Sequence, residues 1–210
     1  MNVLYHSFWV SSKAGISQAK LIVWEMTDLL VLELVEKGLV TDQMVLDIGY
    51  DIENMRHEAG SVGKKGYRGS IHIDHYGRTV PKPAHGSVNL GKYTSSTKLI
   101  LNAMTDLYER ITNSNLLVRR VTVTASHVIR EEDIPKPEET PEQFDLFTDY
   151  EAIQQEREQA AKEEHKEKSL QHAMIAIKHK FGKNAILKAS NLQEGAMTIE
   201  RNQQLGGHHE

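Results

Sequence analysis

The composition of the chain changes abruptly at Arg130, and this change divides the sequence into two parts. The residues before it alternate as in a strand, whereas Glu131 to Glu142 (EEDIPKPEETPE) contains three prolines among acidic residues. Such a stretch cannot bury enough apolar area to fold by itself. We therefore expect a folded domain at residues 1–130, a linker at residues 131–142 and a separate C-terminal region.

The two parts also differ in charge. Residues 1–130 contain 15 Lys and Arg against 12 Asp and Glu, whereas residues 131–210 contain 10 against 17, so the net charge of −4 hides parts of +3 and −7. The basic excess lies in residues 51–130, which hold 12 basic and 6 acidic residues. A chain that is acidic as a whole can therefore still present a basic surface to a polyanion.

The sequence excludes several classes of protein. It has no cysteine, which rules out a disulfide scaffold, a thiolate zinc site and a cysteine nucleophile. Its longest apolar run, Leu29 to Leu32, lies between Asp28 and Glu33 and is far shorter than the about 20 apolar residues of a membrane span. The N-terminus lacks the basic and then apolar order of a signal peptide, so we expect a soluble, cytoplasmic protein.

Periodic apolar patterns in residues 1–130 predict an α+β domain. Apolar residues recur at helical spacing from near Ser17 onward. In this predicted helix Glu25, Asp28 and Glu36 form only a narrow polar stripe, and Gly38 is the signal that ends it. A second helix is predicted after the capping residues Thr94 to Ser96. We expect a four-stranded antiparallel or mixed sheet covered on one face by these two helices. Strands are predicted at Val3–Val10, Met44–Tyr50, Gly69–His75, His85–Leu90 and Leu116–Ser126.

The predicted strand at Leu116–Ser126 has two different sides. Its alternation places Val121, Val123 and Ala125 on one side. A sheet with one covered and one polar face follows from this pattern. The polar side consists of Arg120, Thr122, Thr124 and Ser126.

The C-terminal region, residues 148–210, is predicted to be a helical tail. Tyr150 to Lys168 is rich in Glu, Lys, Gln and Ala, which is typical of an exposed helix. From Ser169 to Phe181 apolar residues recur at helical spacing. We expect this end either to pack on a partner or to fold back on the domain.

A short motif, QFDLF, stands directly after the linker. A tethered peptide of this kind can hold a hydrophobic groove with its apolar side chains while its glutamine hydrogen-bonds at the rim. The motif resembles the pentapeptide, usually Gln-Leu-(Ser/Asp)-Leu-Phe, by which bacterial polymerases and repair proteins bind the sliding clamp. The alternative is that its apolar side chains only tether the tail to the domain. The motif comprises Gln143, Phe144, Asp145, Leu146 and Phe147, with Phe144 in place of the usual leucine.

Residues 51–130 contain the candidates for binding nucleic acid. Phosphates are contacted by cationic and hydroxyl side chains on an exposed surface, and the polar side of the last strand offers both. The capped start of the second helix would add backbone N–H donors for a phosphate. An ordinary solvated surface is the alternative. The predicted DNA-binding residues are Lys64, Lys65, Arg68, Arg78, Lys82, Lys92, Thr94, Ser95, Ser96, Arg119, Arg120, Thr122 and Thr124.

Histidines near His72 to His75 (HIDH) raise the question of a metal site. In a strand His72 and Asp74 share one face while His75 points to the other, so the spacing does not favour a common metal ion. The sequence also lacks GxSxG and HExxH motifs, and Gly63 to Gly66 (GKKG) lacks the spacing of a P-loop. We therefore predict no metal site and no cofactor in this chain.

The order of the segments resembles the C-terminal part of a Y-family translesion DNA polymerase, of the UmuC/DinB-like (ImpB/MucB/SamB) type found in Gram-positive bacteria. In that family this region is the little finger, a four-stranded sheet backed by two helices that grips duplex DNA, and its tail recruits the polymerase to the clamp. The resemblance rests on GISQAKL, EMTDLL, MVLDIGYD, HGSVNL, YTSSTKLI with LYERI, and LLVRRVTVTAS, and on QFDLFTDYE, KHKFGKNAILKA and TIERNQQLGGH in the tail.

The resemblance implies a role in DNA repair by error-prone lesion bypass, as in the SOS response. It places Arg119–Ser126 and the loops Lys64–Arg68 and Arg78–Lys82 against primer–template DNA, and Gln143–Phe147 in the clamp pocket. The sequence does not contain the carboxylates with which the family's palm holds Mg²⁺, so we expect no polymerase activity from this chain alone. Two alternatives stay open: a protein that binds the clamp or another polymerase subunit without DNA, and a metal-dependent enzyme that uses the histidines.

Overall fold

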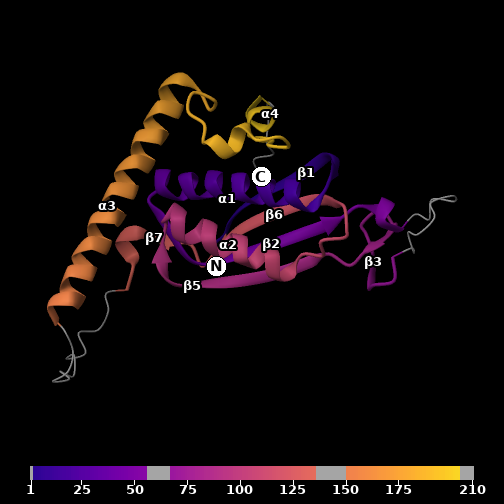
Figure 1. The fold of residues 1–210 in the computed structure, drawn as a ribbon, viewed down its shortest axis with the longest axis horizontal. Coiled ribbons are helices and arrows are strands. Elements are labelled where there is room, and N and C mark those ends of the chain that lie inside the picture. Colours follow the sequence, from indigo (N-terminus) through magenta and orange to yellow (C-terminus); the bar gives the residue numbers. More distant parts are fainter. Residues whose placement is uncertain (1, 56–66, 136–149, 204–210) are drawn as a thin grey trace.

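The computed structural model describes residues 2–55, 67–135 and 150–203. It confirms the α+β class, and the strand pairs in the described part are antiparallel. The main sheet has the strand order β1-β6-β2-β5, and β7 pairs with the start of β2 (Figure 1). Its strands are β1 (Leu4–Ala14), β2 (Leu39–Tyr50), β5 (Ala84–Thr94), β6 (Val118–Ser126) and β7 (Ile129–Arg130).

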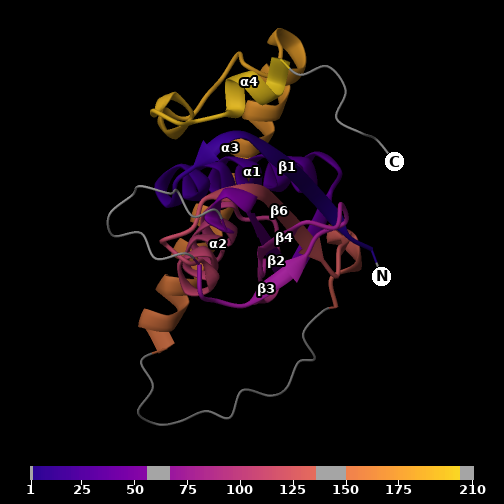
Figure 2. The same ribbon diagram turned by 90° about the vertical axis from the view of Figure 1, so that its right-hand side faces the viewer.

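Two helices, α1 (Ile16–Glu36) and α2 (Thr97–Ile111), pack against each other and against one face of this sheet (Figure 2). The core forms between the two layers because apolar residues alternate in the strands and recur every three or four residues in the helices. Burying each of these side chains stabilises the fold by about 1.5–3 kcal/mol. Fully buried members of the core include Ile22, Met26, Leu30, Leu34, Met44, Leu46, Ile48, Val121, Val123 and Ala125.

Local signals in the sequence define the ends of both helices. The helix α1 ends at Gly38, whose φ of +63° favours glycine, and whose N–H donates to the carbonyl of Val35. The helix α2 begins where Ser96 Oγ accepts a hydrogen bond from the N–H of Leu99 at 3.3 Å. A Cβ at Gly86 would lie 2.9 Å from Cγ2 of Ile111, so α2 packs directly on the backbone of β5.

The predicted strand at Gly69–His75 does not join the main sheet. Only β3 (Ile71–Ile73) is extended, and it pairs with β4 (Thr79–Pro81) in a separate hairpin. The hairpin contacts the short helix η1 (Ile52–Met55) through β4, where Val80 is buried. All three residues of β3 are exposed, so no second layer covers the two isoleucines that share one face of this strand.

The C-terminal region folds back on the domain. The helix α3 (Tyr150–Phe181) is continuous, and its first half extends away from the sheet while its second half approaches α1 (Figure 1). Side chains 153–166 are exposed, whereas Gln171 and Met174 are buried. In the described part of the chain, no helix has both the length and the apolar character needed to cross a membrane. The shorter helices are η2 (Glu131–Asp133), η3 (Ala189–Leu192) and α4 (Thr198–Gln203), of which η3 and α4 lie over α1.

Candidate nucleic-acid interface

The face of the main sheet that points away from α1 and α2 is exposed to solvent. Along β6, Val121 and Val123 are buried against the helices, whereas Arg120 is exposed and Thr122 half-buried on the opposite side. Strand register aligns the neighbouring strands with these positions. We call this surface the open face, and it comprises Tyr5, Ser7, Trp9, Gln43, Val45, Asp47, Gly49, His85, Ser87, Asn89, Arg119, Arg120, Thr122 and Thr124.

A bulge in β6 exposes two consecutive arginines. Gly49 of β2 pairs with Arg120 while the next residue, Tyr50, pairs with Val118, so Arg119 is an extra residue in β6. Regular alternation would have buried one of the two arginines. Both are exposed instead, as the DNA-binding prediction requires.

The two arginines have different partners. Arg119 donates a hydrogen bond to the carbonyl of Val10 at 2.8 Å, and its Nε lies 4.0 Å from a carboxylate oxygen of Asp51. Arg120 has its guanidinium carbon 5.5 Å from the centre of the Trp9 ring. Arg119 is therefore anchored to the backbone of β1, and Arg120 presents its charge beside an aromatic ring.

Hydroxyl, amide and imidazole groups occupy the middle of the open face. Ser7 and Thr122 are hydrogen-bonded through their side chains at 2.9 Å, and His85 Nδ1 lies 2.7 Å from Asp47 Oδ1. Asp47 is an acidic group at this position, so the positive charge of the face is concentrated at the arginine end. Thr124, which pairs with Tyr5, is half-buried on the same side. Ser126, expected on the polar side, is buried, and its carbonyl accepts a hydrogen bond from Thr41.

The hairpin β3–β4 places further cations beyond the end of β2 that pairs with Arg120. Arg68, Arg78 and Lys82 are exposed there. A hydrogen bond from Arg78 Nε to Asp74 at 2.7 Å raises the pKa of the guanidinium above its ordinary value and lowers that of the carboxyl. Arg78 is therefore charged but already paired. The predicted DNA-binding residues Lys64 and Lys65 lie outside the described residues.

The start of α2 is already occupied by a carboxylate. Glu167 of α3 accepts hydrogen bonds from Ser96 Oγ at 2.8 Å and from the N–H of Lys98 at 2.9 Å. The carbonyl of Ser95 accepts a hydrogen bond from Gln171, and Thr94 is buried. These groups were expected to hold a phosphate, but the structure turns them toward α3, and they lie at the opposite end of the sheet from Arg120. Lys92, also expected to bind DNA, lies 3.6 Å from Glu164 of α3.

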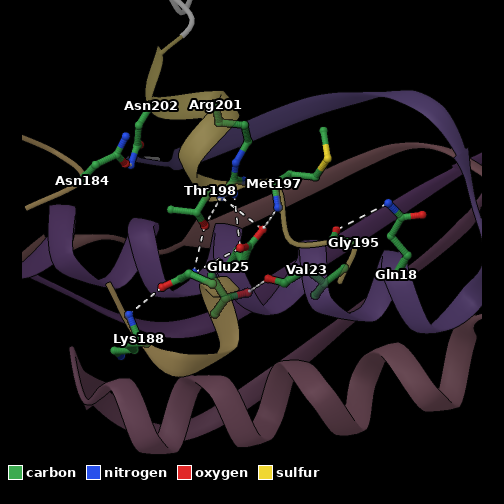
Figure 3. A network of polar contacts seen from close by, with 12 residues as sticks. Gln18, Val23, Glu25, Asn184, Lys188, Gly195, Met197, Thr198, Arg201 and Asn202 are labelled. Atoms are coloured by element: carbon green, nitrogen blue, oxygen red, sulfur yellow. Dashed lines mark hydrogen bonds and ion pairs between the residues drawn. The ribbon is translucent and has the colours of Figure 1, made fainter. Parts of the chain in front are cut away.

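A second polar site, on the α1 side of the molecule, was not predicted. Glu25 belongs to the polar stripe of α1, yet it is only 2% exposed. Its carboxylate accepts hydrogen bonds from the backbone N–H groups of Met197 at 2.9 Å and Thr198 at 3.2 Å, where α4 begins (Figure 3). The amide of Asn191 donates at 3.1 Å, and the guanidinium of Arg201 lies 3.9 Å away. We call this group the Glu25 network.

The residues around the Glu25 network extend the attachment of the C-terminal segment. Burial lowers the pKa of Arg201, and the charge of Glu25 opposes that effect. Lys188 forms an ion pair with Asp28, one turn after Glu25, and its ammonium lies 5.3 Å from the centre of the Trp24 ring. Two carboxylates one turn apart in an apolar helix were the signal that could have predicted a docked cationic segment.

The structure separates the residues of the HIDH segment. Asp74 accepts hydrogen bonds from Arg78 and from the backbone N–H of Tyr76, while His72 and His75 are exposed. In residues 2–55, 67–135 and 150–203 no group of three or more histidine, aspartate or glutamate side chains could hold a metal ion.

The predicted clamp-binding residues Gln143, Phe144, Asp145, Leu146 and Phe147 lie outside the described residues. The described chain ends before them at residue 135, just after η2, and resumes after them in α3. Glu131 of η2 and Lys168 of α3 form an ion pair at 2.5 Å, so the segments on both sides of the motif contact each other.

Comparisons with known proteins do not assign the chain to a family. No model of a known protein family matches it, and no curated protein matches it. One similar solved structure is a complex of the beta-clamp processivity factor and the little finger domain of PolIV. Its sequence identity is 8% and its TM-score 0.38, and the similarity covers 70% of this chain and 100% of that chain. A similarity at this level leaves the function to be argued from the residues themselves.

Proposed function

We propose that this chain is the DNA-binding and clamp-recruiting part of an error-prone Y-family translesion polymerase, with no polymerase activity of its own. The observation that carries the proposal is the open face, a sheet surface that the described helices leave uncovered, with exposed Arg119 and Arg120 beside Thr122 and Thr124. The order of the sequence segments supports the choice of family. Primer extension assays with Mg²⁺ should show no nucleotide addition by the chain alone.

The open face has the chemistry of a phosphate-binding surface. Guanidinium groups and hydroxyls are the side chains that contact phosphate oxygens without reading base sequence. Arg119 and Arg120 are adjacent in sequence, so the bulge presents two charges within the span of neighbouring phosphates. We expect binding of primer–template DNA without sequence preference.

The acidic part of the molecule would orient the DNA. Residues 131–167 hold 14 acidic and 4 basic residues, and the described part of this segment contacts the end of the sheet opposite to Arg120. A polyanion is repelled from the α3 end and attracted to the arginine end. The charge asymmetry of the sequence thus corresponds to an acidic end and a basic end of the sheet.

Charge reversal tests the DNA surface. In Arg119→Glu/Arg120→Glu, affinity for a fluorescent duplex should fall by more than about tenfold, and the log–log salt slope should lose about 2 because two phosphate contacts are removed. Fluorescence anisotropy at several salt concentrations measures both quantities. The matched control is Lys162→Glu/Lys166→Glu on the exposed side of α3, which changes the net charge equally and should preserve most of the affinity. Equal losses in both variants would contradict the proposed surface.

Calorimetry with a bacterial sliding clamp tests recruitment. We expect micromolar binding by the whole chain and none by Leu146→Ala/Phe147→Ala, because the two apolar side chains would fill the clamp pocket. Thr148→Ala, just after the motif, is the control and should bind as the unchanged chain does. No binding by any of the three proteins would make the motif a tether between linker and tail.

The alternative, a protein that binds the sliding clamp or another polymerase subunit without binding DNA, is favoured by a different surface. A groove of about 600 Å³ runs between α2 and α3, with Leu99, Ala160 and Leu170 among its apolar lining residues. Leu170 is 60% exposed, which is unusual for a leucine near a helix contact. If Leu170→Glu abolishes binding to a polymerase subunit while the unchanged chain retains no DNA, the alternative replaces the main proposal.

A further inference from the structure

Two large aromatic side chains stand exposed on the open face. Tyr5 is 58% and Trp9 52% exposed, and both belong to β1 at the edge of the main sheet. They are four residues apart on one strand, so they lie about 13 Å apart along the same face. Neither one belongs to the apolar core between the sheet and the helices.

The groups around these aromatics are polar or cationic. Trp9 pairs across the strands with Arg120, Tyr5 pairs with Thr124, and Ser7 between them pairs with Thr122. A protein interface is also rich in aromatic residues and arginine, but its buried core is more apolar than the rest of the surface. This surface combines ring faces with cations and hydroxyl groups instead.

Aromatic rings beside cations on a sheet are the arrangement that binds unpaired bases. The bases stack on the rings while cations contact the phosphates, and any base is accepted because every base has a π-face. Paired bases inside a duplex expose only their edges, so they cannot stack on a protein ring without leaving the helix. The aromatics therefore distinguish single-stranded from double-stranded nucleic acid, which the arginines alone cannot do.

We propose that the open face binds single-stranded DNA by stacking unpaired bases on Trp9 and Tyr5, beside the phosphate contacts of Arg119 and Arg120. This inference rests on the proposed function, since it assumes that the open face binds DNA, and it adds the class of DNA that the face prefers. A primer–template junction offers both classes, with the duplex for the arginines and the unpaired template for the rings.

The chain has only two tryptophans, and this allows a direct measurement. In Trp24→Phe the emission of Trp9 is the only tryptophan signal, and phenylalanine preserves a ring for the Lys188 contact. Three DNA probes of one sequence are titrated: a blunt duplex, the duplex with a single-stranded 5′ extension, and the single strand. Stacking should quench Trp9 emission with the two probes that contain unpaired bases and leave it nearly unchanged with the blunt duplex.

Affinity measurements with variants of Trp9 complete the test. Trp9→Leu should weaken binding to the single strand by about tenfold, because the ring on which a base stacks is lost, and should weaken binding to the blunt duplex far less. Trp9→Phe retains a ring and should restore most of the affinity. The unfolding midpoint of Trp9→Leu serves as the control for a merely structural role, and we expect it to stay unchanged.

The outcomes separate this inference from the proposed function. Equal quenching by blunt and single-stranded probes, or an unchanged single-strand affinity in Trp9→Leu, would overturn stacking. Duplex binding that still depends on Arg119 and Arg120 would in that case leave the proposed function intact. Absence of binding to all three probes would overturn both.

Discussion

The two sides of this molecule treat their polar groups in opposite ways. On the α1 side, Glu25 is buried, and its carboxylate has donors from Met197, Thr198 and Asn191 within hydrogen-bond distance. On the open face, Arg120 is exposed and has an aromatic ring beside it. A buried charge must be satisfied by the protein itself, whereas an exposed charge can be satisfied by water or by a ligand. The first arrangement therefore serves stability, and the second remains available for binding.

Removal of Glu25 should produce the largest change in stability. Glu25→Ala leaves two backbone N–H groups without their acceptor and the guanidinium of Arg201 without its counter-charge, so we expect the free energy of unfolding to fall by about 3 kcal/mol. Urea unfolding measures this loss, and amide hydrogen exchange at Met197 and Thr198 should accelerate. The control is Glu109→Ala, because its ion pair with Lys20 is exposed and should contribute under about 1 kcal/mol. Similar losses in both variants would remove the contrast between the two sides.

Arg120→Ala should have the reverse profile. DNA affinity should decrease by about tenfold, because one phosphate contact is lost, while the unfolding midpoint should stay unchanged. Arg119→Ala should affect both quantities, since Arg119 also holds the carbonyl of Val10. The two variants therefore compare a binding role and a structural role at adjacent residues of one bulge. A destabilised Arg120→Ala with normal DNA binding would assign this arginine to the fold instead.

Glu167→Ala should have a smaller effect on stability. The change removes the acceptor for Ser96 Oγ and the Lys98 N–H at the start of α2, and the loss of such a cap costs about 1 kcal/mol. Thermal unfolding measures the loss, with Glu163→Ala, one turn earlier on α3, as the control. DNA affinity should not decrease, because this end of α2 lies away from the open face. A marked decrease would show that the α2 end takes part in binding.

Acid should weaken the α1 side through Glu33, and this effect should be the smallest. Burial raises the pKa of Glu33, but the hydrogen bonds from Lys37 and His6 lower it by more than burial raises it. The pKa of Glu33 therefore lies below its ordinary value. Because the pKa of Glu33 is lower in the folded state, the ionised carboxylate stabilises the fold at pH values above the unfolded-state pKa of about 4.3. This contribution is lost as the pH falls below that value. Stability measured between about pH 5 and pH 3 should therefore decline less in Glu33→Gln than in the unchanged chain. Parallel declines in both proteins would show that other carboxylates are responsible.

Local patterns predicted the open face well because that face depends on neighbours in sequence. The alternation in β6 indicated which side chains are buried, and Val121, Val123 and Ala125 are fully buried as expected. The extra residue in the bulge was not visible, since it depends on how β6 pairs with two other strands. Gly38 was recognised as the end of α1 because a positive φ has a local signature.

Long-range contacts account for what the sequence did not show. The polar stripe of α1 was predicted without a partner, but it binds a segment that lies far along the chain. The start of α2 was expected to hold a phosphate, but Glu167 of α3 occupies it, from the region beyond the predicted linker. The isoleucines of β3 looked like part of the main sheet, although they belong to a hairpin without a second layer. In the first two cases the partner lies far away in sequence, whereas β3 pairs with the nearby β4.

The distance between the partners in the Glu25 network has a consequence for biosynthesis. Met197 follows Glu25 by 172 positions, so the residues that satisfy the carboxylate are made long after α1. At about 5–20 residues per second, that interval is roughly 10 to 30 seconds. During this time the nascent domain can fold around its sheet, but the outer side of α1 stays exposed until the segment that covers it has been synthesised. Docking of Met197 on Glu25 thus comes long after the synthesis of α1, and a chain stalled before that step would offer an exposed helix to chaperones and proteases.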